Sequence, residues 1–177
     1  MNSKTTETTV SLPNLLVDGS DAEFRELIAL LYATSGRLQA MRRELAKALS
    51  VSIAEFSVLT ALMYLEQHET RIRVRTVADH LRVSGAQVTA IVRKLESNGW
   101  VDKKTDPDDY RAVSLSLTSG ARKKLATFAP FLRAVNDRWF DGMTRREFEA
   151  VGKFLQRIVR QYDGANAKVL DLQHDRD

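Results

Sequence analysis

Side chains that can read the edges of DNA bases recur on one face of a helical segment in the middle of the chain. Glutamine can pair with adenine and arginine with guanine through two hydrogen bonds each, and small residues allow close approach to the major groove. At about 100° per residue, these types lie opposite the apolar side of the segment that follows Ser84. They are Ala86, Gln87, Ala90, Arg93, Lys94 and Ser97. An ordinary amphipathic helix with a solvated face has the same pattern, so this face alone does not define a reading surface.

The residues before this segment have the pattern of a helix-turn-helix. A short helix is predicted over residues 74–81, in which the small Ala78 permits a close crossing of the two helices. Leu81 and Val83 are expected to fill the angle between the helices, and Ser84 is expected to cap the second helix. Ser84 therefore joins the DNA-facing set.

The second helix is predicted over residues 85–97, and Gly99 follows at the spacing of a C-terminal cap. The period then changes to two, which predicts short strands over 100–104 and 113–117. The connection 105–110 is rich in turn-forming residues and is expected to form an extended tip. This hairpin adds two basic candidates for contacts with DNA, Lys103 and Lys104.

Four Ser/Thr-x-x-Glu/Gln pairs precede apolar-periodic stretches and predict capping boxes at helix starts. These are Ser20 with Glu23, Ser52 with Glu55, Ser84 with Gln87, and Thr144 with Glu147. Further helices are predicted over 21–49, 53–67, 119–140 and 145–162, and Pro130 is expected to kink or break the third of these. The last is expected to bury Phe148, Val151, Leu155, Ile158 and Val159.

Several local strings resemble the MarR family of bacterial transcriptional regulators. The resemblance in element order covers residues 24–162 and is most specific between 77 and 120. The matching strings are VADHLRVS (77–84), VTAIVRKLESNG (88–99), DPDDYRA (106–112) and LSLTSG (115–120).

The resemblance implies a mainly helical α+β fold, a winged helix-turn-helix with a two-stranded β-wing. It also implies that Arg111 of the wing enters the minor groove and that Asp109 orients it. A narrow minor groove concentrates negative potential, which attracts a guanidinium group; a plain surface salt bridge is the alternative for this pair. The chain departs from the family at Tyr110, Gln87 and Ala90, so base preference does not carry over.

The domain organisation follows from these elements. A flexible tail is expected over 1–19, a DNA-binding domain over 51–118, and a polar tail over 164–177. The family resemblance implies that 20–50 and 119–163 form a helical dimerisation region. The aromatic residues there could also be simple core. A two-fold dimer would place two reading helices about one turn of DNA apart, which implies double-stranded DNA with a pseudo-palindromic operator as partner.

Family members commonly bind a small aromatic or anionic effector between the dimer helices and the DNA-binding lobe. The candidate lining residues are Tyr32, Arg37, Met41, Met63 and His68, although a lone Tyr or Met at helical spacing is more often part of the core. The three histidines lack metal-ligand spacing, so we expect neither a metal nor a cofactor.

Composition narrows the function classes. The 177 residues include 27 Lys and Arg against 23 Asp and Glu, and no cysteine, which excludes disulfides and thiol chemistry. There is neither a signal peptide nor a long apolar run, so a cytoplasmic protein without a membrane span is expected. No nucleophile–base pair, paired-carboxylate site or phosphate loop indicates an enzyme. Together with the DNA-reading pattern, the resemblance to the MarR family implies a homodimeric, effector-released repressor; the alternative is a ligand-independent architectural or partner-recruiting DNA-binding protein.

Overall fold

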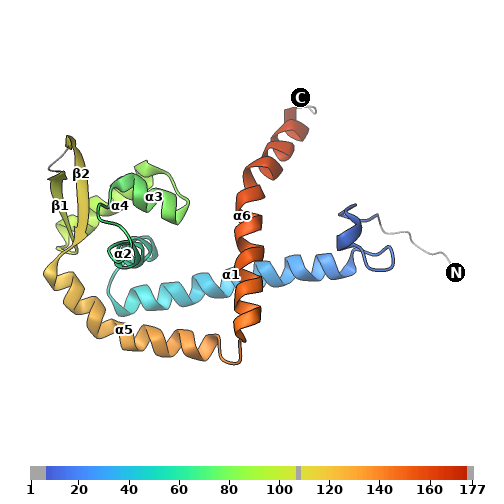
Figure 1. Ribbon diagram of the computed structural model, residues 1–177, viewed down its shortest axis with the longest axis horizontal. Helices are drawn as coiled ribbons and strands as arrows, with labels where there is room; N and C mark the ends of the chain where they lie inside the picture. The colour runs from blue at the N-terminus through green and yellow to red at the C-terminus, as the bar shows by residue number, and fades with distance from the viewer. Residues whose placement is uncertain (1–6, 107–108, 175–177) are drawn as a thin grey trace. The chain divides into compact units, whose positions relative to one another are not determined.

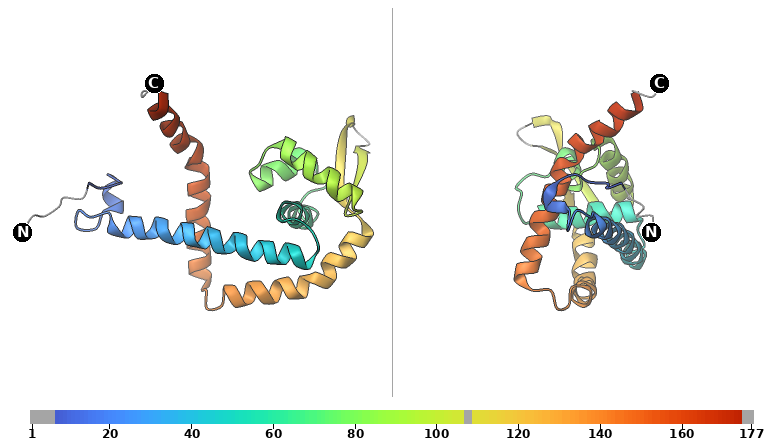
Figure 2. Two further views of the ribbon diagram at one scale, coloured as in Figure 1. Left: turned by 180° about the vertical axis from the view of Figure 1, so that it is seen from behind. Right: turned by 90° about the vertical axis from the view of Figure 1, so that its right-hand side faces the viewer.

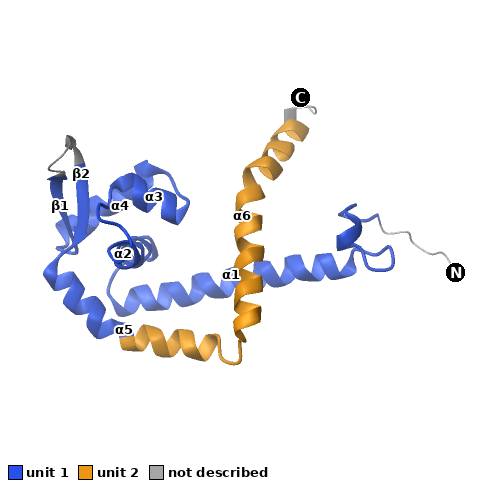
Figure 3. Cartoon of the chain, viewed as in Figure 1, with its two compact units in different colours: residues 1–129 blue, residues 130–177 orange. Residues whose placement is uncertain are grey.

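The computed structural model describes the backbone of residues 7–106 and 109–174, and the side chains of residues 7–105 and 113–173. The chain forms two compact units, Met1–Ala129 and Pro130–Asp177 (Figure 3). Their boundary falls at Pro130 inside a helix, where proline cannot donate the backbone hydrogen bond that continues the helix.

The fold is mainly helical, with a two-stranded antiparallel wing between helices, as the sequence predicted (Figure 1). In chain order the elements are η1 (Pro13–Leu15), α1 (Ala22–Ala48), α2 (Ile53–Leu65), α3 (Val74–Leu81), α4 (Gly85–Ser97), β1 (Val101–Asp106), β2 (Asp109–Leu117), α5 (Ser119–Trp139) and α6 (Arg145–His174).

Helix α2 forms the centre of the first unit. It is rich in apolar residues on all sides, and it contacts α1, α3, α4 and β2. The largest fully buried side chains come from α2, α3, α4 and the wing, and include Phe56, Leu59, Val77, Leu95 and Leu115. This core fixes the position of α3, α4 and the base of the wing relative to one another.

Three of the four predicted capping boxes form, at Ser52, Ser84 and Thr144. The prediction at Ser20 is wrong. Helix α1 begins one residue later, with Asp21 as its N-cap, because the backbone of Ser20 forms a bridge with Val17. The hydroxyl of Ser20 accepts a hydrogen bond from the amide of Ala22 instead.

The described part of the predicted N-terminal tail is held against α1. The carboxylate of Asp21 accepts hydrogen bonds from the backbone amide and the hydroxyl of Thr9, at 2.6 and 2.7 Å. These bonds, the amide bond first, lower the pKa of Asp21 to about 2. The guanidinium of Arg25 adds a bond to the carbonyl of Glu7. The expected flexible tail is therefore an ordered segment from residue 7 onward.

Helix α6 differs from the prediction in two ways. It continues to His174, so the polar tail expected after residue 163 is helical through its described part. Its apolar residues were expected to be buried, and in the single chain they are exposed: Phe148 59%, Val151 45%, Leu155 44%, Ile158 47% and Val159 50%.

Among the described residues, no single helix is long and apolar enough to cross a membrane. Helices α1 and α2 reach that threshold only when taken together across an 85° bend, and α2 is largely buried in the core.

Candidate nucleic-acid interface

The turn between α3 and α4 is held by backbone hydrogen bonds. The amides of Arg82 and Val83 both donate to the carbonyl of Ala78, and Arg82 adopts the left-handed conformation with φ of 57°. Ala78 is buried at the helix crossing, as predicted. Val83 does not fill the angle between the helices; it is 41% exposed and faces an open pocket.

Helix α4 buries one face and leaves the opposite face exposed. Val88, Val92 and Leu95 are fully buried, so the rotation of the helix about its axis is fixed. The predicted reading residues are all exposed: Ser84, Ala86, Gln87, Ala90, Arg93, Lys94 and Ser97. The arrangement brings these seven side chains onto one surface.

The C-terminal end of α4 is closed by Gly99, which has a φ of 70°. The amide of Trp100 donates to the carbonyl of Leu95, and that of Gly99 donates to Glu96, which is the Schellman pattern. Trp100 is buried beyond this turn. The predicted cap at Gly99 is confirmed, and it directs the chain from α4 straight into the wing.

The side chain of Gln87 already has a structural task. Its amide oxygen accepts from the backbone amide of Ser84 at 3.1 Å, and its own backbone amide donates to the Ser84 hydroxyl at 3.3 Å. A glutamine needs both its oxygen and its nitrogen to pair with adenine. Gln87 must therefore leave the cap before it can read a base in that way.

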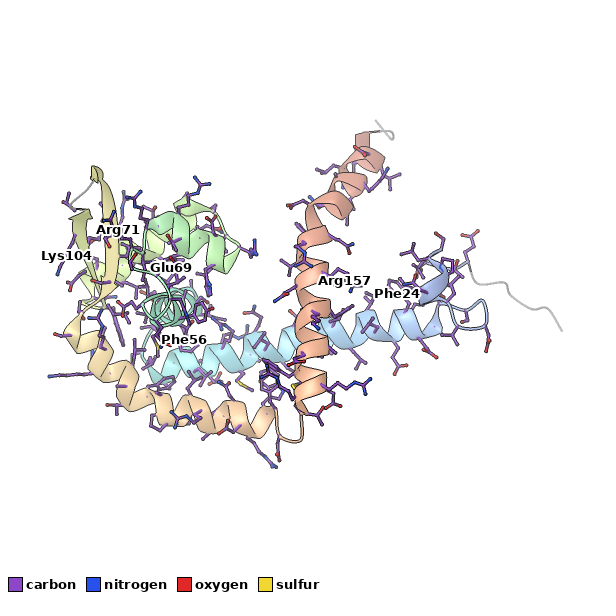
Figure 4. All side chains as sticks on the ribbon, viewed as in Figure 1. Phe24, Phe56, Glu69, Arg71, Lys104 and Arg157 are labelled. Carbon is purple, nitrogen blue, oxygen red and sulfur yellow. The ribbon has the colours of Figure 1, made fainter. Side chains whose placement is uncertain are left out.

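The wing stands beside α4 in each view (Figure 2). Lys103 forms an ion pair with Glu96 at the end of α4, which reduces the charge it offers to phosphate. Lys104, labelled in Figure 4, is exposed on β1. Of the two basic residues predicted on β1, Lys104 thus presents the freer charge.

The strands of the wing are longer than predicted. Residues 105 and 106 belong to β1, and 109 and 110 belong to β2, so four of the six residues expected in the extended tip lie in strands. The pairing runs regularly from Val101–Leu117 to Thr105–Val113 and then jumps to Asp106–Asp109. The backbone of 110–112 is therefore extra length on β2, which is a bulge in the strand pairing. The side chains of Asp109 and Arg111 lie outside the described residues.

An open pocket of about 540 Å³ lies against the exposed side of α4. Its lining comes from α1, α2, the helix-turn-helix turn and α4: Gln39, Ala54, Ser57, Leu81, Val83, Gln87, Ala90 and Ile91. Two of these residues, Gln87 and Ala90, also belong to the predicted reading surface. The pocket and the reading surface therefore share a helix and two side chains.

A basic group stands behind the pocket wall. The guanidinium of Arg42 donates to the hydroxyl of Ser57 at 2.8 Å and lies 5.4 Å from the ring centre of Phe56, labelled in Figure 4. Partial burial lowers the pKa of Arg42 from its ordinary value. No described carboxylate forms an ion pair with Arg42. The sequence analysis did not identify Gln39, Arg42 and Ser57 as candidates for this pocket. The available signal was the spacing of Gln39 and Arg42, two polar residues three positions apart beside the apolar stripe of the first helix.

The five predicted effector residues do not line this pocket. Tyr32 is 84% exposed, Arg37 bonds to the carbonyl of Ala33 on its own helix, and Met41 is half-buried on α1. Met63 packs against the core, and the ring of His68 contacts that of Tyr64 in a tilted arrangement with ring centres 4.4 Å apart.

Comparison with known proteins gives consistent matches. The family model described as transcriptional regulator SarA/Rot matches residues 40–128. An uncharacterised HTH-type transcriptional regulator of Bacillus subtilis, YdcH, is 26% identical over 62% of this chain and 76% of its own length. The crystal structure of the regulator MarR from Oenococcus oeni superposes with a TM-score of 0.65 at 18% identity, covering 76% of this chain and 98% of that one. The S. aureus MepR–DNA complex superposes with a TM-score of 0.64 at 14% identity, covering 85% and 99%.

Proposed function

The chain belongs to the MarR/SarA family of winged helix-turn-helix transcriptional regulators, and from this premise we propose that it is a homodimeric repressor that a small effector releases from its operator. The family consists of DNA-binding regulators, not enzymes. The proposal concerns the three finer points: how DNA is read, what covers the exposed helices and what releases the complex.

Contact with DNA is assigned to α4 and the wing. In this proposal α4 enters the major groove with Arg93 and Lys94, while Arg111 of the wing reaches the minor groove and is oriented by Asp109. The solved complex of the similar MepR contains DNA, which supports a DNA-bound state for this fold. Ser84, Ala86, Ala90 and Ser97 permit close approach.

A second copy of the chain is proposed to cover α6. The helix carries an exposed apolar face along its described length, from Phe148 at 59% exposure to Leu172 at 62%. Exposed apolar surface of this extent is typical of an interface with another chain. A two-fold dimer would present two α4 helices to a pseudo-palindromic site.

The observation that carries the release mechanism is the pocket against α4. A ligand there would contact Gln87 and Ala90 from the side, and these residues also face the proposed DNA surface. Occupancy therefore changes the environment of the reading helix directly. An aromatic or anionic compound fits the mainly apolar wall and the guanidinium of Arg42 behind Ser57.

The test of DNA reading measures binding to the DNA upstream of the chain's own gene by fluorescence anisotropy. Arg93→Ala and Arg111→Ala should weaken binding, each by about five- to one-hundredfold. Lys47→Ala is the matched control, because Lys47 is an exposed cation in the last turn of α1, outside the proposed DNA-contacting set, and it pairs with Glu44. Unimpaired binding by both arginine variants would refute these assignments. A salt titration separates phosphate contacts from base contacts, since the former dominate the slope.

The test of release measures melting temperature and DNA affinity against a panel of aromatic carboxylates and phenols. A ligand at 100 times its Kd should stabilise the protein by about 2.7 kcal/mol and weaken DNA binding. Ala54→Phe should remove both effects by filling the pocket, whereas Ala40→Phe, on an exposed position of α1 outside the lining, should not. Specific DNA binding that no compound alters would favour the ligand-independent architectural role instead.

A further inference from the structure

A single carboxylate joins three elements at the base of the wing. One oxygen of Glu66, the residue that ends α2, accepts from the backbone amide of Leu117 at 2.8 Å. The guanidinium of Arg122, in the first turn of α5, binds both oxygens of the same carboxylate, at 2.7 and 3.2 Å. A two-bond arginine–carboxylate pair is among the stronger and more directional side-chain contacts.

The carboxylate of Glu66 supplies an acceptor at the edge of β2 that does not pair with β1, where a third strand would otherwise supply a carbonyl. Strand β2 pairs with β1 on one edge, and on its other edge the amide of Leu115 donates to the carbonyl of Ile72 at 2.7 Å. Two residues further along, the amide of Leu117 has the carboxylate of Glu66 as its acceptor. Leu117 is only 2% exposed, so its amide requires a protein acceptor.

The contact among Glu66, Leu117 and Arg122 lies at the base of the wing, so a small rotation there produces a larger displacement at the far end of the wing. Strand β2 pairs with β1 from Val101–Leu117 to Asp106–Asp109, so the wing extends about 17 Å beyond the end anchored at Leu117. A rotation of about 5° at Leu117 would displace the far end of the wing by roughly 1.5 Å. Such a displacement exceeds what a hydrogen bond in a minor groove tolerates.

We propose that Glu66 is a positioning residue that sets the direction of the wing and thereby the DNA contact assigned to Arg111. The inference rests on the proposed function of the wing. Arg122 takes part by fixing the carboxylate, which otherwise has a single backbone partner from β2.

The surroundings allow the joint to open without collapse of the core. Glu66 and Arg122 border a polar pocket of about 410 Å³, together with Glu69, Thr70, Ile72, Ser114, Leu115 and Ser116. Water in this pocket can solvate the separated groups. Glu69, labelled in Figure 4 beside Arg71, belongs to the same wall but is exposed and makes no hydrogen bond to β2 among the described residues. It is therefore the matched control.

The first measurement needs no DNA. Amide hydrogen exchange of the full-length protein should be about tenfold faster at Leu117 and along β2 in Glu66→Ala than in wild type. Arg122→Met, which leaves the Glu66–Leu117 bond in place, should accelerate the same amides by about threefold. Glu69→Ala should stay within about twofold of wild type. Exchange along β2 that is unchanged in both Glu66→Ala and Arg122→Met would overturn the proposal.

The second measurement tests the link to DNA by a double-mutant cycle. Glu66→Ala should weaken operator binding by about five- to tenfold in the wild-type background and by less than about twofold in the Arg111→Ala background. Equal weakening in both backgrounds would mean a general structural defect and would refute a role through the wing. If Arg111→Ala itself leaves binding unchanged, the proposed wing contact fails, while the exchange data still decide whether Glu66 holds the wing.

Discussion

Replacing Gln87 separates two tasks that one side chain is expected to perform. In the free protein, its oxygen accepts from the amide of Ser84 at 3.1 Å and completes the capping box of α4. In the DNA complex, we predict that the same side chain turns to a base. Glutamate retains the capping geometry and favours the positive end of the helix, whereas alanine removes the cap.

The magnitudes follow from these two contacts. A paired contact to adenine contributes about 1–3 kcal/mol, and leaving the cap costs about 1 kcal/mol. The net gain on binding is therefore up to about 2 kcal/mol, a factor of up to about 30 in affinity. Loss of the cap alone should lower the melting temperature by about 2–4 °C for a chain of 177 residues.

Gln87→Ala should therefore lower both the stability of the protein and its affinity for DNA. Gln87→Glu should keep or raise the stability, but it should lower the affinity for DNA further, because it adds a negative charge at the DNA-facing surface. Thermal melts and anisotropy titrations at low temperature measure the two effects. Glu55→Ala, which removes the equivalent side chain from the capping box of α2, should lower stability without a DNA-specific loss. Operator affinity that survives in Gln87→Ala would show that this residue remains a cap in the complex, and the reading role would be wrong.

Three further predictions concern the scaffold. Gly99→Ala should destabilise the protein by about 1–2 kcal/mol in denaturant titrations, because Gly99 has a φ of 70°; a loss below about 0.3 kcal/mol would contradict the role of this cap. Leu95→Ala should lower the free energy of unfolding by about 2–5 kcal/mol, because Leu95 is fully buried where α4 packs on the core. Leu30→Ala, at an exposed position, is the control. Acidification should release the N-terminal segment: the pKa of Asp21 is lowered to about 2 from 3.8, so its contribution is complete above 3.8 and is lost as pH falls toward 2. Exchange of the Thr9 amide reports this release, Asp21→Asn should show weakened protection already at neutral pH, and protection that is constant from pH 5 to pH 2 would contradict it.

Local patterns were enough to predict the DNA-binding lobe. The limits of α3 and α4 follow from residues that act within one or two turns, such as the hydroxyl of Ser84 and the glycine at 99. The exposed face of α4 follows from the spacing of Val88, Val92 and Leu95 alone. Capping and periodicity are short-range, so a single sequence contains them.

The predictions that failed depend on contacts between distant residues. Ser20 does not cap α1: its backbone pairs with Val17, and the N-cap Asp21 is held by Thr9, twelve residues away. Val83 has an apolar side chain but faces an open pocket, whose other walls come from α1, α2 and α4.

The exposed α6 shows a further limit. An amphipathic pattern specifies that one face needs a partner, but it does not specify whether that partner belongs to the same chain. The sequence by itself therefore determined the fold class and which residues of α4 are exposed, since both rest on local periodicity. Only the tertiary structure decided that Gln87, the predicted capping partner of Ser84, also borders a pocket, and that the carboxylate of Glu66 supplies an acceptor to β2 at the base of the wing. Both arrangements bring together groups far apart in the chain, up to 51 positions for Glu66 and Leu117.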